Sequence, residues 1–113
     1  MATRKLDKEQ WKTFFDRVSK MLEGKQAEIE VASLSLGDQV QAEWLPLHGI
    51  TYDPKDDLME VTLEGLDHLI AKPCEVYVQD GTMGLESVEI IDADGIKQIV
   101  KLRDELKPPP TPR

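Results

Sequence analysis

Residues 42–63 read AEWLPLHGITYDPKDDLMEVTL, and this stretch decides how the chain is expected to fold. Its centre is the acidic sequence Asp-Pro-Lys-Asp at residues 53–56. Aspartate followed by proline is typical of a type I turn. Apolar residues alternate with polar ones on both sides of this turn, which is the period of a strand with one buried face. The stretch therefore predicts two strands, at residues 47–53 and 57–63, joined by a tight reversal.

Upstream of this hairpin, the sequence predicts an amphipathic helix from Asp7 to about residue 23. Its apolar face has aromatic and aliphatic residues at helical spacing: Trp11, Phe14, Phe15, Val18 and Leu22. Asp7 and Gln10 form a capping-box pattern at its start, and Gly24 supplies a left-handed residue at its end. Because aromatic residues at this spacing usually pack a helix on a sheet, we interpret the face as core rather than as a ligand site.

Further runs of period two predict strands at residues 27–31, 40–44, 74–78, 85–91 and 96–102. Residues 66–70, Leu-Asp-His-Leu-Ile, are interpreted as a short helical turn or an irregular crossover that ends before Pro73. Cys74 is expected to face the core together with Val76 and Val78. The predicted fold class is α+β: an N-terminal amphipathic helix packed on a strongly bent antiparallel sheet or small barrel of about six to seven strands.

The 113 residues are expected to form one domain over residues 1–103. Residues 104–113 read DELKPPPTPR and are expected to form a flexible Pro-rich tail. Pro109 and Pro112 have the PxxP spacing that SH3-type domains bind, but that spacing is very permissive. We interpret the tail as solvated.

The charge distribution disfavours nucleic acids and membranes as partners. The net charge is −8, with seven basic and four acidic residues at 1–26 and seven basic and eighteen acidic residues at 27–113. A body this acidic repels phosphate backbones and anionic lipids. There is no apolar run of transmembrane length and no signal-peptide pattern. The single cysteine, Cys74, favours a reducing compartment, so the predicted location is cytoplasmic.

Two groups of residues are candidate sites for metal binding or catalysis. Asp53, Asp56 and Asp57 supply carboxylates that a hard cation could use, but turn formation explains them equally well, so no metal and no cofactor are predicted. Asp67, His68 and Cys74 combine a carboxylate, a base and a thiol. A buried cysteine is usually inert, and this argues against a nucleophilic site.

Trp44, His48 and Tyr52 are the candidate binding residues, because they could line a pocket or an interface beside the acidic turn. The alternative for His48 is a partly buried, hydrogen-bonded histidine. No phosphate-binding loop, hydrolase elbow or paired Cys/His set occurs in the sequence.

Four segments resemble a family of small uncharacterised bacterial proteins: WKTFFDRVSK at 11–20, AEWLPLHGITYDPKDDLMEV at 42–61, GLDHLIAKP at 65–73 and DADGIKQIVKLRD at 92–104. The resemblance extends over residues 5–104 and implies a bacterial, cytosolic source. It implies no activity or site residues that could be carried over. The helix-then-sheet order is also similar in shape to Sm-like proteins, but their RNA-contacting basic and glycine motifs are missing, and fold does not fix function.

Two hypotheses for function follow from the sequence. The first is a non-catalytic cytosolic module for protein interaction or self-association, which works through an exposed strand edge or the surface from Trp44 to Tyr52. The alternative is a small-molecule-binding or enzymatic domain that uses the region of His48 and Tyr52 with the turn at residues 53–57. An RNA-binding role is a distant third.

Overall fold

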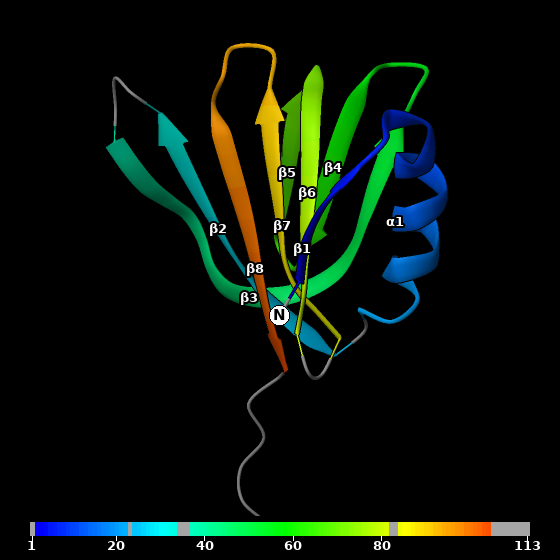
Figure 1. The fold of residues 1–113 in the computed structure, drawn as a ribbon. Helices are drawn as coiled ribbons and strands as arrows, with labels where there is room; N and C mark the ends of the chain where they lie inside the picture. Colours follow the sequence, from blue (N-terminus) through cyan, green and yellow to red (C-terminus); the bar gives the residue numbers. More distant parts are fainter. Residues whose placement is uncertain (1, 23, 34–36, 82–83, 105–113) are drawn as a thin grey trace, which may run out of the picture.

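The computed structural model of the chain describes residues 2–22, 24–33, 37–81 and 84–104. The described residues form eight strands, one 3-10 helix and one α-helix. In chain order these are β1 (Ala2–Leu6), η1 (Lys8–Gln10), α1 (Trp11–Ser19), β2 (Lys25–Ser33), β3 (Gly37–Asp53), β4 (Leu58–Leu63), β5 (Leu66–Ala71), β6 (Pro73–Gly81), β7 (Gly84–Asp92) and β8 (Lys97–Asp104). Figure 1 shows α1 on one side of the molecule and the hairpin of β2 and β3 on the other.

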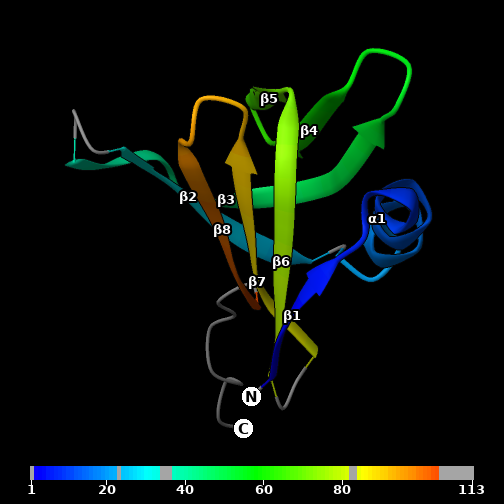
Figure 2. The ribbon, with the colours of Figure 1, turned by 45° about the horizontal axis from the view of Figure 1, so that its top comes forward.

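The strands pair antiparallel throughout, in the order β1-β6-β7-β8-β2-β3-β4-β5. The sheet is open, with β1 and β5 at its two ends, and Figure 2 separates these two strands clearly. The predicted fold class is therefore wrong. The described chain is mainly β, with eight strands in an open sheet and one short helix, rather than α+β with a strongly bent sheet or small barrel of six to seven strands. The antiparallel pairing that the sequence predicted is confirmed.

Two strands that the sequence did not predict account for much of this correction. Among residues 3–6 of β1, whose burial the structure describes, only Leu6 is buried, so the pattern is too weak to indicate a strand. β1 is a strand because it pairs with β6, from Ala2 opposite Asp80 to Leu6 opposite Val76. The predicted helical turn or crossover at residues 66–70 is also wrong, because these residues lie in β5.

A two-residue turn creates the hairpin of β4 and β5. Gly65 has a φ of 78°, a left-handed conformation that glycine adopts without strain, and Leu63 pairs with Leu66 across the turn. The expectation that Cys74 faces the core is wrong as well. The register of β6 against β7 shifts between Pro73 and Glu75, which changes the alternation of side chains, and Cys74 is exposed.

The predicted helix exists, but α1 ends at Ser19 instead of near residue 23. After Ser19 the backbone continues in tighter turns, in which Met21 N–H donates to the Val18 carbonyl and Leu22 N–H to the Ser19 carbonyl. Gly24 has a φ of 86°, as the sequence predicted for a left-handed residue after the helix. All five residues of the predicted apolar face are buried: Trp11, Phe14, Phe15, Val18 and Leu22.

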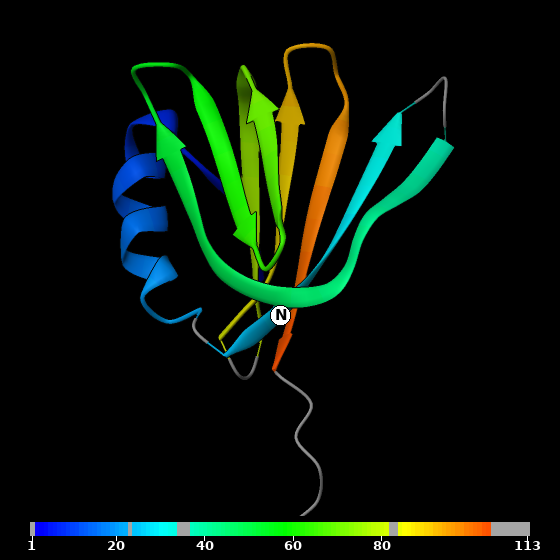
Figure 3. The same ribbon diagram turned by 180° about the vertical axis from the view of Figure 1, so that it is seen from behind.

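One strand, β3, joins the two parts of the sheet, which are the five strands from β1 to β2 and the hairpin of β4 and β5. Residues 37–46 of β3, its N-terminal half, pair with β2, and residues 47–53, its C-terminal half, pair with β4. The strands predicted separately at residues 40–44 and 47–53 are parts of one continuous, bent strand, which Figure 3 shows as a U. Trp44 lies at the bend with a φ of 49°, and the register shifts on either side of it.

The core lies between α1 and the sheet. It is one cluster that includes the apolar face of α1 and the inward-facing residues of the strands, such as Ile29, Ile50, Val61 and Val100. The Pro-rich tail predicted at residues 104–113 lies outside the described residues, apart from Asp104, which ends β8.

Candidate functional sites

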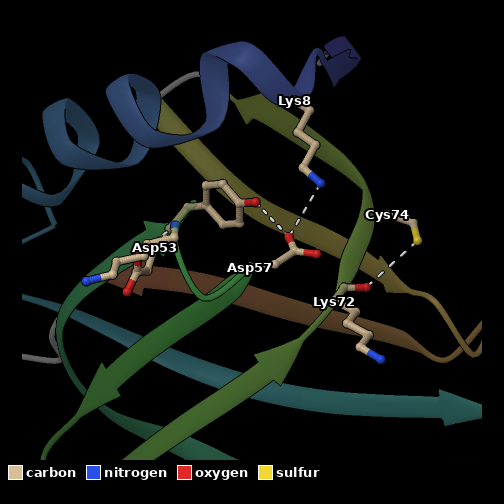
Figure 4. Close-up of polar contacts among 7 residues, drawn as sticks. Lys8, Asp53, Asp57, Lys72 and Cys74 are labelled. Atoms are coloured by element: carbon tan, nitrogen blue, oxygen red, sulfur yellow. Dashed lines mark hydrogen bonds and ion pairs between the residues drawn. The ribbon is translucent and has the colours of Figure 1, made fainter.

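The acidic turn of the opening stretch forms a polar cluster around Asp57 (Figure 4). Tyr52, near the end of β3, donates its hydroxyl to Asp57 Oδ1 at 2.7 Å. Lys8, from η1, places its Nζ 3.4 Å from the same oxygen. The ring of Tyr52 is buried and packs edge-on against Trp11, with ring centroids 5.1 Å apart. The cluster therefore fastens the start of the helix to the turn between β3 and β4.

The two partners of this hydrogen bond shift each other's ionisation. Burial of the ring, followed by the hydrogen bond to Asp57 and its negative charge, raises the pKa of Tyr52 to about 12. The hydroxyl of Tyr52, helped by the charge of Lys8, lowers the pKa of Asp57 below its ordinary value. Both shifts favour the pair in which tyrosine is neutral and aspartate is ionised.

The three aspartates that the sequence marked as weak metal candidates have separate roles. Asp53 accepts the backbone N–H of Lys55 at 2.9 Å, which is an Asx turn. Asp57 is held by Tyr52 and Lys8, and Asp56 is exposed. Within the part of the chain that the structure describes, no three His, Cys, Asp or Glu side chains are grouped so that they could hold a metal ion.

The candidate binding residues Trp44, His48 and Tyr52 do not surround one cavity. Trp44 lines a shallow surface cavity beside β7 and β8, where the guanidinium of Arg103 lies 4.0 Å from the centre of its ring. Tyr52 borders a different hollow, beside Lys8 and Asp57. His48 is exposed and lines neither of them. The register shift near His48 turns these three side chains toward different surroundings. Their role in binding stays a prediction.

His68 and Cys74, from the group that the sequence disfavoured as a nucleophilic site, have separate contacts. His68, on β5, makes a short hydrogen bond through Nε2 to the side chain of Gln98 on β8. The thiol of Cys74 contacts the carbonyl oxygen of Lys72 at 3.8 Å, as Figure 4 shows. Gln98 is the buried polar residue among those described, so its contact with His68 satisfies a group that would otherwise destabilise the core.

Sequence reasoning missed the most distinctive surface, which is the free edge of β5. Leu69 is 54% exposed and Leu66 is 37% exposed on this strand. The sequence alone does not identify them, because leucines at residues 66 and 69 fit a helix as well as a strand. The two leucines become noticeable only when β5 is known to end the sheet.

A second feature that the sequence did not indicate is a groove of about 340 Å³ beside α1. Its floor contains Phe14 and Val18 from the helix and Leu85 from β7, and its rim contains Arg4 and Arg17. Phe14 and Val18 belong to the predicted core, and this prediction is confirmed, since each is less than a tenth exposed. Their outer surfaces nevertheless form part of the groove.

These features define the chain as a small, mainly β protein whose candidate catalytic side chains are held in structural contacts. Among the described residues, no helix has the length and hydrophobicity required to cross a membrane. The chain belongs to a family of unknown function, DUF5335, which matches residues 2–111. This confirms the resemblance to a family of uncharacterised bacterial proteins.

An uncharacterised protein from Aquifex aeolicus (strain VF5) is similar to nearly the whole chain. The two sequences are 39% identical over 110 residues, which cover 96% of this chain and 99% of the relative. The similarity supports the bacterial assignment of the family. No solved structure matches the chain.

Proposed function

We propose that this chain is a non-catalytic, cytoplasmic interaction module that associates with a second copy of itself through β5. The observation that carries the proposal is the exposure of Leu66 and Leu69 on a strand that ends an open sheet. An edge strand presents unpaired backbone N–H and C=O groups, so an edge with exposed apolar side chains is a template for another strand.

The backbone of β5 offers such groups at alternate residues. Leu63 and Leu66 close the two-residue turn, so they form a hydrogen-bonded pair, and the pairs then alternate along the hairpin. His68 and Ile70 accordingly direct their backbone groups toward β4. The N–H and C=O groups of Leu69 and its alternate neighbours point away from the sheet, where a second strand can reach them.

The strand at the other end of the sheet carries protection that β5 lacks. On β1, Arg4 pairs with Asp80 at 3.3 Å and Lys5 pairs with Glu75 at 3.3 Å. Charged side chains, lysine above all, are a common means of preventing edge-to-edge association. β5 contains one charged residue, Asp67, and no lysine or arginine.

The sequence of β5 is also suited to pairing with itself. Asp67 is the charged residue of this strand. In an antiparallel two-fold arrangement centred on His68, Asp67 of one copy lies opposite Leu69 of the other, so the two aspartates do not meet. Like charges directly opposite each other weaken the pairing of two strands, and this arrangement avoids them.

The non-catalytic part of the proposal rests on the contacts of the candidate catalytic groups. Tyr52 and Asp57 hold each other, and His68 is hydrogen-bonded to Gln98. Each of these contacts satisfies a polar group at the margin of the core. They support a structural role for side chains that an enzyme would direct toward a substrate.

The test is the mass of the protein in solution, measured by light scattering during size-exclusion chromatography. We expect a mass of two chains for the wild type, and at least about tenfold weaker association for Leu69→Lys, which places a charge on the free edge. The matched control is Val40→Lys, at a residue of β3 that is 55% exposed but lies outside β5, and it should leave the mass unchanged. A single-chain mass for the wild type at about 1 mM protein, or equal effects of the two substitutions, would refute the proposal.

A further inference from the structure

We infer that the groove beside α1 binds a small amphipathic monocarboxylate, whose apolar tail lies on the floor and whose carboxylate meets Arg17. This site is separate from the association through β5, because it lies next to β1 at the other end of the sheet. The inference therefore does not depend on the proposed function.

The size and the floor of the groove indicate an apolar ligand of modest length. Its volume of about 340 Å³ lies near the lower limit for small-molecule sites, which span roughly 300–1,000 Å³. Phe14, Val18, Leu22 and Leu85 contribute to its lining. Met21 adds a flexible apolar wall that is 67% exposed.

The charge of the rim is opposite to that of the protein as a whole. Among the residues that the structure describes, Arg4, Arg17 and Lys25 line the groove together with one acid, Asp80. Arg4 is already engaged, because its Nε lies 3.3 Å from Asp80 and its guanidinium lies 5.6 Å from the centre of the Phe14 ring. On a chain with a net charge of −8, this rim is a local site of attraction for an anion.

Arg17 is the residue with a free guanidinium at this site. It makes no hydrogen bond or ion pair with any other residue that the structure describes, and its side chain is exposed. A guanidinium presents a fork of N–H donors that matches both oxygens of a carboxylate. Arg17 therefore supplies the polar anchor, and the floor beside it supplies the apolar contact.

The same observations favour a monocarboxylate over a polyanion. The groove has one arginine without a partner among the described residues, and the chain as a whole carries a net charge of −8, which disfavours a ligand with several phosphates. A neutral alkyl compound would bury the same apolar surface but would leave Arg17 without a partner. The ligand class is thus a single carboxylate attached to a short alkyl or aromatic group.

The test uses octanoate as the probe and follows amide shifts in ¹⁵N–¹H NMR spectra of the full chain. We expect saturable shifts at Phe14, Val18 and Leu85, with a dissociation constant at least about tenfold lower for octanoate than for octanol. No saturable shift up to about 5 mM octanoate, or equal binding of the acid and the alcohol, would overturn the inference.

Substitutions on α1 separate specific binding from general attraction of anions. Arg17→Gln should raise the dissociation constant for octanoate at least about tenfold. Lys20→Gln is the matched control, because it removes the same charge from the same end of the helix at an exposed residue that does not line the groove. Equal effects of the two substitutions would show that octanoate responds only to net charge. The NMR spectrum of each variant reports at the same time whether it is folded.

Discussion

The two halves of β3 have the same kind of sequence but different surroundings. In the N-terminal half, residues 37–41 are all exposed, and the strand pairs with β2 alone. In the C-terminal half, Leu47, Ile50 and Tyr52 are buried, and the strand lies between β4 and α1. Alternation of apolar and polar residues predicts strand in both halves. Whether the apolar face is buried depends on a helix that comes from elsewhere in the chain.

The hydroxyl of Ser19 contacts the edge of the C-terminal half of β3 that faces α1. It donates to the carbonyl oxygen of Ile50 at 2.7 Å and accepts the N–H of Ile50 at 2.9 Å. One side chain of α1 thus satisfies both backbone groups of Ile50, which point away from β4. A Cβ atom at Gly49 would lie 3.3 Å from Ser19 Oγ, so the glycine permits this close approach.

The largest expected effect separates the two halves directly. Ile50→Ala should lower the free energy of unfolding by about 2–5 kcal/mol, because Ile50 is fully buried and its truncation leaves a cavity. Val40→Ala, in the exposed half, should change it by less than about 0.5 kcal/mol. Urea denaturation of both variants measures the contrast. Similar losses would mean that the N-terminal half is also part of the core.

A smaller loss of stability is expected when Ile50 of β3 loses its hydrogen bonds to α1. Ser19→Ala leaves the N–H and C=O of Ile50 without their partner, and we expect a loss of about 1–3 kcal/mol. Thr13→Ala, at an exposed position of the same helix, is the control and should cost less than about 0.5 kcal/mol. Amide exchange at Ile50 should accelerate in the first variant. An unchanged exchange rate there would contradict the role assigned to Ser19.

The hydroxyl of Tyr52 should have an effect that depends on pH. Tyr52→Phe removes the hydrogen bond to Asp57, which should cost about 1 kcal/mol at neutral pH. Because the folded pKa of Tyr52 is raised from 10.0 to about 12, the wild type should lose stability as the pH rises through that interval. The difference between the two proteins should therefore shrink above pH 10, as measured by urea denaturation at a series of pH values. A constant difference up to pH 12 would contradict the raised pKa.

The smallest effect is expected from Asp57 at low pH. Its folded pKa lies below the ordinary value of 3.8, so its contribution is complete above that value and is lost as the pH falls below it. In Asp57→Asn the loss of stability with acid should be shallower than in the wild type. The comparison requires thermal unfolding between about pH 2 and pH 5. Parallel curves for the two proteins would exclude Asp57 as a contributor.

The sequence predicted those parts of the fold in which local pattern and tertiary packing agree. The helix face from Trp11 to Leu22 and the hairpin of β3 and β4 are of this kind. Prediction from the sequence failed where pairing with another strand determines the structure. β1 buries little but Leu6 and exists because β6 lies beside it, and the leucines of residues 66–70 fit a helix as well as a strand.

The candidate sites could be predicted only in part for a related reason. A bend with positive φ at Trp44 and a bulge next to Cys74 change which face each side chain occupies. A count of alternate residues cannot include such changes. The groove of Arg17 requires that β1 and β7 meet α1, and this proximity arises only from the order of strands in the sheet.

Because β3 pairs with both parts of the sheet, through β2 and through β4, it also bears on how the protein opens. Neither β2 with β8 nor β4 with β5 can detach as an intact unit without releasing hydrogen bonds of the same strand. We expect the amide protons of β8 and β4 to exchange through one common opening, with equal protection against solvent. In such an opening the bent strand is the element through which the two parts of the sheet unfold together.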